Sequence, residues 1–139
     1  MKFSTFSCGI AALASTNFAF ARLSYEVAEA VCGGLGVMNT TALPASINVE
    51  DARICADHPL GSPELPQQLD KRKCWYGQPV GCNRHGYCYK SCGPPGTGMW
   101  CWTAQRDGFG PWERCSKGSD CSGTMGCGAG GCKGCGCGC

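Results

Sequence analysis

The sequence predicts a small disulfide-rich fold, with a short helix and a small antiparallel β-sheet in residues 73–139 and an irregular glycine-rich C-terminal tail. Fifteen of the 139 residues are cysteine, and twelve of these follow one dibasic pair, Lys71-Arg72. Glycine is also abundant, at 22 residues. A short chain of this composition cannot bury enough apolar surface to fold on that basis alone, so cross-links between cysteines are expected to order it.

The first 21 residues have the layout of a secretory signal peptide. Met1-Lys2 gives a basic start, an apolar stretch runs from Phe6 through Ala14, and a small-x-small site ends at Ala21. This stretch is shorter than the roughly 18 apolar residues that a membrane helix needs. We therefore expect cleavage after Ala21 and a secreted, extracellular protein whose thiols are oxidised to disulfides.

Residues 22–72 are predicted to form an acidic propeptide. They carry four basic and seven acidic residues, a net charge of −3, whereas residues 73–139 carry seven basic and three acidic residues, a net charge of +4. Several prolines keep the approach to Lys71-Arg72 extended and accessible to a processing protease. Cleavage after Arg72 would leave an even number of cysteines on each side, as independent disulfide domains require. We expect the acidic segment to mask the basic mature peptide until that cleavage.

Three local features are predicted within residues 22–72. Asn39-Thr40-Thr41 is an N-glycosylation sequon with Asn39 as the acceptor. Residues 48–56 carry acidic side chains in a first turn and are followed by a proline, which predicts a short helix. A disulfide between Cys32 and Cys55 would tie this helix to the turn at Gly33-Gly34.

Residues 73–139 show no sustained helical periodicity. One or two helical turns are predicted over residues 86–92, which would place Cys88 and Cys92 on one face, four residues apart. From Cys115 onward glycine dominates, and disulfides are expected to provide most of the order in this tail.

A strand is predicted over residues 99–104. The alternation there places Trp100 and Trp102 on one face and Cys101 on the other. Asp107-Gly108 then predicts a turn, followed by a return strand over residues 109–112.

All fourteen cysteines that follow the predicted signal peptide are expected to form disulfides, because their number is even and the compartment is oxidising. Spacing alone leaves their connectivity open. They are Cys32, Cys55, Cys74, Cys82, Cys88, Cys92, Cys101, Cys115, Cys121, Cys127, Cys132, Cys135, Cys137 and Cys139.

The pattern Cys88-x-x-x-Cys92, taken with Cys135-x-Cys137 or Cys137-x-Cys139, resembles the cysteine-stabilised αβ signature of defensins and related toxins. In that family two cysteines one helical turn apart cross-link a helix to a Cys-x-Cys strand, and the resemblance implies the same topology here. The five cysteines from Cys101 to Cys132 depart from the family's minimal pattern.

Residues 82–88, Cys-Asn-Arg-His-Gly-Tyr-Cys, resemble the Cys-x-x-x-Gly-Tyr-Cys stretch of hevein-like chitin-binding modules, although the adjacent cysteine pair that precedes it in those modules is missing. The resemblance implies a sugar-binding site. Tyrosine and tryptophan rings stack on sugar faces or lie at partly hydrated interfaces. The alternative for this chain is that several of its rings form the small core. The rings concerned are Trp75, Tyr76, Tyr87, Tyr89, Trp100, Trp102 and Trp112.

Metal binding, catalysis and nucleic-acid binding have little support. The tract over residues 131–139 resembles metallothionein thiolate tracts, but secretion favours disulfides there, so neither a metal nor another cofactor is expected. His85 is the one histidine after Arg72, and no nucleophile stands near it in sequence, so no catalytic residue and no enzymatic activity are expected. The seven basic residues after Arg72 are dispersed, which disfavours nucleic acid as a partner.

Taken together, the order of signal, acidic segment, dibasic site and basic disulfide peptide resembles that of small secreted cysteine-rich proteins of filamentous fungi, whose precursors are cut by kexin-type proteases. The resemblance implies a non-enzymatic peptide that binds a cell-surface target, in the manner of an antimicrobial or toxin-like peptide. The alternative is an effector or signalling peptide that binds a receptor or a cell-wall glycan such as chitin. The residues expected to contact the membrane, receptor or glycan are Trp100, Trp102, Tyr87, Tyr89, Arg84 and Lys90.

Overall fold

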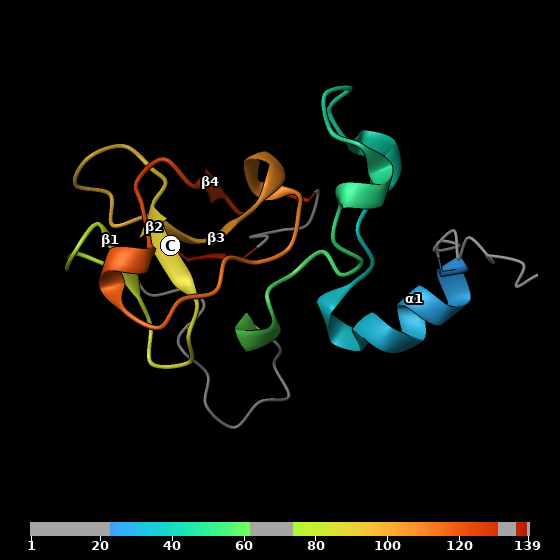
Figure 1. Cartoon of the computed structure of the whole chain (residues 1–139), viewed down its shortest axis with the longest axis horizontal. Helices are drawn as coiled ribbons and strands as arrows, with labels where there is room; N and C mark the ends of the chain where they lie inside the picture. The colour runs from blue at the N-terminus through green and yellow to red at the C-terminus, as the bar shows by residue number, and fades with distance from the viewer. Residues whose placement is uncertain (1–22, 62–73, 131–135, 139) are drawn as a thin grey trace, which may run out of the picture.

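A computed structural model of the chain describes residues 23–61, 74–130 and 136–138. These residues form a small disulfide-rich fold with one short α-helix and one small antiparallel sheet, the fold class that the sequence predicts. Figure 1 shows the helix and short helical turns of residues 23–61, which we call the N-terminal part, beside the sheet of residues 74–138, which we call the C-terminal part. The green segment at the end of the N-terminal part runs back toward the sheet (Figure 1).

The α-helix, α1, lies in the N-terminal part and runs over Tyr25–Cys32. Its buried residues, Ala28 and Cys32, are one turn apart, so one face of the helix packs inward. It ends at Gly33, whose φ of 49° is a conformation that glycine adopts without a steric penalty.

The helix predicted over residues 48–56 is wrong. The structure has a single 3-10 turn there, η3 over Val49–Asp51, and Ala52 is already extended. The Asn48 side chain accepts a hydrogen bond from the Glu50 N–H, which favours a short turn over a continuing helix. The other short 3-10 turns of this part are η1 (Gly33–Leu35), η2 (Thr40–Ala42) and η4 (Pro59–Gly61).

Two segments of the N-terminal part pair with each other. The Met38 N–H donates to the Ile54 carbonyl at 2.8 Å, and the Ala56 N–H donates to the Gly36 carbonyl at 2.8 Å. The disulfide between Cys32 and Cys55 joins this pairing to the end of α1. The covalent link and the backbone hydrogen bonds therefore fix residues 53–58 in position relative to the helix.

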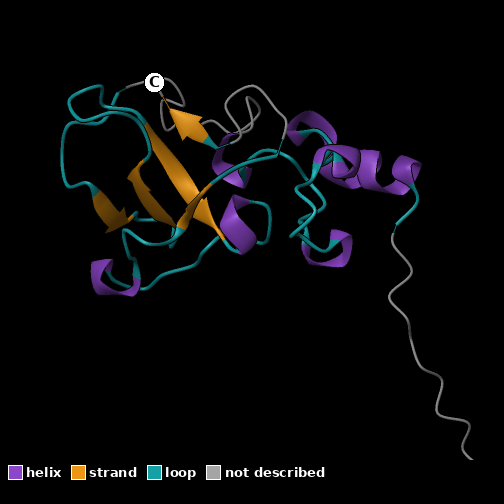
Figure 2. Cartoon of the chain, turned by 90° about the horizontal axis from the view of Figure 1, so that it is seen from above, coloured by secondary structure: helices purple, strands orange, loops and turns teal. Residues whose placement is uncertain are grey.

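The sheet of the C-terminal part has the strand order β1-β2-β3-β4, and β5 also pairs with β3. All its pairings are antiparallel. Figure 2 shows the longer strands lying side by side. The strands are β1 (Val80–Cys82), β2 (Cys88–Ser91), β3 (Trp100–Ala104), β4 (Gly126–Cys127) and β5 (Cys137–Gly138).

The central strand is β3, and it confirms the strand predicted over residues 99–104. Trp100 pairs with Ser91 of β2 on one edge and with Gly138 of β5 on the other. Further along that second edge, Thr103 and Ala104 pair with β4. The glycine-rich tail, expected to be irregular, thus contributes two short strands, because its backbone N–H and C=O groups complete the open edge of β3.

The turn predicted at Asp107-Gly108 is present as η5, a 3-10 turn over Arg106–Gly108. The predicted return strand over residues 109–112 is reduced to an isolated bridge between Ala104 and Trp112. A second 3-10 turn, η6 over Gly118–Asp120, lies in the tail.

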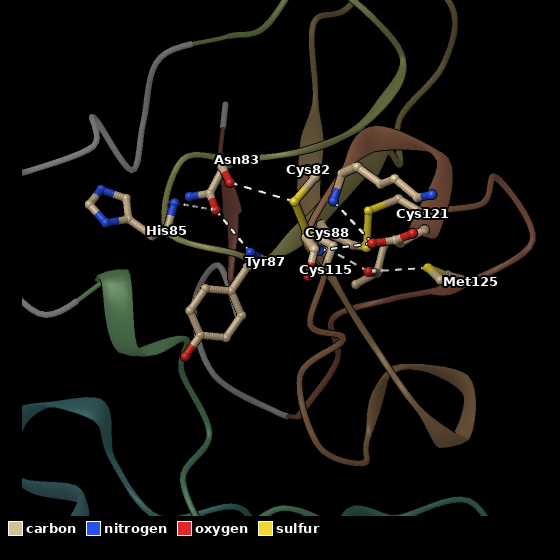
Figure 3. Close-up of a disulfide and its surroundings, with 12 residues drawn as sticks. Cys82, Asn83, His85, Tyr87, Cys88, Cys115, Cys121 and Met125 are labelled. Carbon is tan, nitrogen blue, oxygen red and sulfur yellow. Dashed lines mark hydrogen bonds between the residues drawn. A yellow bond between two sulfur atoms is a disulfide. The ribbon is translucent and has the colours of Figure 1, made fainter.

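The helix predicted over residues 86–92 is wrong, since Cys88–Ser91 is the strand β2. A tight turn joins it to β1, and in that turn the Asn83 side-chain oxygen accepts hydrogen bonds from the N–H groups of His85 and Tyr87 (Figure 3). Gly86 completes the turn with a φ of 76°. The hydrogen bonds that β2 makes to strands on both edges outweigh the local preference for a helical turn.

The described disulfides of the C-terminal part join cysteines in sequence order, so that each bridge interlaces with the others. Cys82 pairs with Cys115, Cys88 with Cys121, Cys92 with Cys127 and Cys101 with Cys137. Cys74 is disulfide-bonded as well. The defensin-like pairing of Cys88 and Cys92 with a Cys-x-Cys strand is therefore wrong. Cys88 is bonded to Cys121 instead, and Cys92 is bonded to Cys127. No bridge among the described cysteine pairs joins the N-terminal part to the C-terminal part.

Candidate functional site

One face of the sheet carries a row of aromatic rings, which we call the aromatic row: Trp75, Tyr89, Trp100 and Trp102. Trp100 and Trp102 alternate along β3 and so share a face, and Tyr89 of β2 stands directly opposite Trp102. The ring centroids of Trp100 and Trp102 are 5.0 Å apart, and those of Trp75 and Tyr89 are 5.9 Å apart, both edge to face. Contacts of this geometry stabilise aromatic pairs and fix the rings relative to one another.

Glycines provide the space on which two of these rings lie. A Cβ added to Gly81 of β1 would meet the phenol of Tyr89, and a Cβ added to Gly138 of β5 would meet the indole of Trp100. The rings therefore lie across neighbouring strands instead of projecting into solvent. Glycines of this chain therefore make room for aromatic rings in addition to forming turns.

Exposure of the aromatic row falls from one end to the other. Trp75 is 45% exposed, Tyr89 and Trp100 are half-buried, and Trp102 is only 4% exposed. Tyr76, next to the exposed end, is 74% exposed. A ligand therefore has access to Trp75 at the exposed end of the row and to parts of the neighbouring rings of Tyr89 and Trp100.

The structure brings together the aromatic residues of the predicted contact set but separates the two basic ones. Arg84 is exposed in the turn between β1 and β2, where its Nε donates to the ring of His85. The Lys90 ammonium donates to the carbonyls of Gly123 and Met125 at 2.7 and 2.8 Å, so it holds the tail against the sheet. Tyr87 is half-buried beneath the guanidinium of Arg114, which lies 4.1 Å from the ring centroid.

The buried end of the aromatic row meets a residue of the N-terminal part. His58 is fully buried, and its imidazole is enclosed by Tyr87, Trp102 and Trp112, with centroid distances of 4.4, 4.5 and 4.8 Å. We call these three rings the aromatic box. Sequence reasoning missed His58, because a histidine within an acidic, proline-flanked segment carries no local signal of burial.

Arg53 is the second residue of the N-terminal part that enters the C-terminal part. Its guanidinium lies 3.9 Å from the centroid of Trp112, and its Nη1 donates to the Gly108 carbonyl at 2.6 Å. Burial lowers the pKa of Arg53 to about 10, against the raising effect of the Asp57 charge. The side chain therefore stays protonated at neutral pH, inside a shell of backbone carbonyls.

Among the described cysteines, two groups of sulfur atoms have a spacing compatible with a bound metal ion, but all six atoms belong to disulfides. They are the groups Cys82, Cys115, Cys121 and Cys92, Cys101, Cys127. A metal ligand is a thiolate, and a disulfide sulfur lacks that charge. Most of the metallothionein-like tract over residues 131–139 lies outside the described residues, and within it Cys137 is disulfide-bonded.

A depression of about 550 Å³ lies in the N-terminal part, between α1 and the segments over residues 37–40 and 49–54. Its lining is mainly apolar and includes Tyr25, Val37 and Ile54. Its polar lining residues are Thr40, Glu50 and Arg53, and the guanidinium of Arg53 is already bound to backbone carbonyls.

Within the described ranges, no helix combines the length and the apolar character needed to cross a bilayer. The high density of disulfides suggests an oxidising, extracellular environment for this chain. No family model, curated protein or solved structure matches the chain significantly, so its fold and site rest on the geometry described above.

Proposed function

We propose that the chain is a secreted, non-enzymatic binding protein that attaches to a cell-surface glycan through the exposed end of the aromatic row. The observation that carries this proposal is the exposure of Trp75, in one row with the partly exposed Tyr89 and Trp100, on a sheet that interlaced disulfides hold rigid. Flat rings fixed before binding stack on sugar faces with little loss of conformational freedom.

The second candidate function is disruption of membranes by a basic, toxin-like peptide. The net charge of +4 in residues 73–139 favours it. Against it, two of these cations serve contacts within residues 73–139, since Lys90 binds two carbonyls and Arg114 covers Tyr87. The aromatic row therefore supports glycan binding better than the charge supports membrane binding.

Co-sedimentation of the purified chain with insoluble chitin and with cellulose tests the proposal. Trp75→Ala and Trp100→Ala should each reduce the bound fraction at least fivefold. Tyr25→Ala, compared in the uncut chain, is the matched control, because Tyr25 is an aromatic residue that is 68% exposed on α1, away from the row. Binding to anionic vesicles with no binding to polysaccharide would favour the membrane reading, and binding to neither would refute attachment through the row.

We further propose that residues 1–21 are a signal peptide and residues 22–72 a propeptide removed by cleavage after Arg72. The cleavage site lies outside the described residues. The separation of the described disulfides supports the proposal, because cutting there breaks no covalent link among them. The intact mass of the secreted product tests it: a mass of residues 73–139 less twelve hydrogens is expected, and a product of residues 22–139 would contradict it.

Asn39 remains the proposed glycosylation site. It is exposed, and its side-chain oxygen accepts hydrogen bonds from the Thr41 N–H and hydroxyl at 3.1 and 2.8 Å. A mass shift on removal of N-glycans from the uncut chain, absent in Asn39→Gln, checks this assignment.

A further inference from the structure

Residues 53–58 contact the C-terminal part in the way that a bound peptide contacts its receptor. The Arg53 N–H donates to the Phe109 carbonyl at 3.0 Å, a main-chain contact between the two parts. The Asp57 carboxylate accepts a hydrogen bond from the Gly136 N–H at 3.0 Å. The side chains of Arg53 and His58, five residues apart, then enter two adjoining subsites that share the ring of Trp112.

The first subsite holds a guanidinium. Backbone carbonyls of Gly108, Gly110 and Ala129, all in the C-terminal part, accept hydrogen bonds from Arg53. The ring of Trp112 closes the subsite by lying against the cation. Carbonyl groups turned inward in this way are costly to leave without a donor, so the subsite is suited to a planar group with several N–H donors.

An unusual loop conformation orients the carbonyls of the first subsite. Arg106 and Asp107 have φ values of 52° and 54°, which non-glycine residues rarely adopt. Gly108 follows at φ 95°, and its carbonyl accepts from Arg53. Backbone held in this region is typical of binding sites, where the surrounding structure maintains a strained turn.

The second subsite is the aromatic box. The imidazole of His58 stacks on Trp102 with an angle of 20° between the planes, and Tyr87 and Trp112 meet it edge to face at 78° and 65°. Three rings around one flat nitrogen heterocycle form a site that selects for shape and for a flat or cationic group.

We propose that these two subsites form a peptide-binding cleft of the C-terminal part, specific for a segment that presents an arginine and, five residues later, a histidine. In this proposal residues 53–58 fill the cleft as a built-in competitor. The cleft is distinct from the exposed end of the aromatic row, and the one residue that it shares with the row is Trp102, at the buried end. The N-terminal part therefore does more than neutralise charge: it occupies a site for a partner peptide. The proposal goes beyond glycan binding and stands if glycan binding fails.

Binding of a labelled peptide to the full-length chain tests the cleft. The peptide reproduces residues 51–60 with serine in place of Cys55. We expect the double variant Arg53→Ala/His58→Ala, in which the built-in segment has lost both side chains, to bind this peptide at least tenfold more tightly than the unaltered chain does. His85→Ala is the matched control, since His85 is an exposed histidine outside the cleft, and it should bind the peptide no better than the unaltered chain.

A second peptide with alanine at both the arginine and histidine positions should not bind the double variant. If the double variant keeps its circular dichroism and its disulfides but gains no affinity for the first peptide, the cleft proposal is refuted. Equal affinity of the two peptides would refute the cleft proposal as well, because the two subsites would then contribute nothing to peptide affinity.

A milder variant keeps the test decisive if the double variant fails to fold. His58→Gly empties only the aromatic box, and free imidazole at millimolar concentration should then raise the thermal unfolding midpoint by several degrees. His85→Gly should show no such rise. An unchanged midpoint for His58→Gly in imidazole would overturn the assignment of the box as a ligand site. Neither measurement involves a polysaccharide, so its failure is distinguishable from failure of the glycan proposal.

Discussion

The imidazole of His58 is stacked on the indole of Trp102, with 4.5 Å between the ring centroids and 20° between the ring planes. The two residues lie on opposite sides of the dibasic pair Lys71-Arg72. In the uncut chain a residue of the predicted propeptide therefore forms part of the core of the predicted mature peptide. This contact explains why Trp102, expected on the contacting surface, is buried.

Replacing His58 should destabilise the chain strongly. His58→Ala leaves a void between three rings, and the expected loss is about 2–4 kcal/mol in the free energy of unfolding. Denaturant unfolding followed by tryptophan fluorescence measures it. His85→Ala, at an exposed turn position, should change stability by less than about 0.5 kcal/mol. Similar losses for the two histidine variants would contradict the aromatic box.

Two disulfides offer a comparison in which loop length is held constant. Cys82–Cys115 and Cys88–Cys121 both close loops with a sequence separation of 33. Loop entropy alone predicts a loss of about 4 kcal/mol for removing either. Cys88 is fully buried, whereas Cys82 and Cys115 are partly exposed. Replacing Cys88 and Cys121 with alanine should therefore cost more than the corresponding change at Cys82 and Cys115.

Thermal unfolding of the two double-alanine variants, compared with the unaltered chain, gives the difference between the bridges. Equal midpoints would show that loop closure alone accounts for the stabilisation and that the burial of Cys88 adds nothing.

Gly108 should be irreplaceable by alanine. Its φ is 95°, and an added Cβ would overlap the backbone carbonyl oxygen of Cys127 in β4, so the backbone of the loop or of the strand would have to shift. We expect Gly108→Ala to lose more than about 3 kcal/mol. Gly118→Ala, where a Cβ meets nothing within 4 Å, should stay within about 0.5 kcal/mol of the unaltered chain. Chemical denaturation of both variants decides the matter, and a stable Gly108→Ala protein would show that this loop conformation is not required.

Asn83 should act through its side-chain oxygen. That oxygen accepts from two backbone N–H groups in the turn before β2, while the buried Nδ2 has no hydrogen-bond partner among the described residues. Asn83→Ala should cost about 1–2 kcal/mol, because two donors lose their acceptor. Asn83→Asp keeps both hydrogen bonds but buries a second carboxylate oxygen at the Nδ2 position, so its loss should be smaller than that of Asn83→Ala without being zero. The order of the unfolding midpoints tests this, and an aspartate variant as unstable as the alanine variant would contradict it.

Local sequence signals predicted only part of the site. The strand over residues 100–104 followed from alternation, and with it the shared face of Trp100 and Trp102. The helix expected over residues 86–92 is a strand because its partners, β1 and β3, lie outside that window. The roles of Arg53 and Lys90 depend on carbonyls that are distant in sequence, so no sequence pattern near either residue predicts these roles.

The sequence by itself determined the fold class, the turn at Asp107-Gly108 and the uneven distribution of cysteine and charge along the chain, because these depend on composition and on neighbouring residues. Only the tertiary structure decided which cysteines pair, which rings are exposed, and that residues 53–58 enter the C-terminal part. These outcomes depend on long-range packing and on finding acceptors for buried donors, as the carbonyl contacts of Arg53 show.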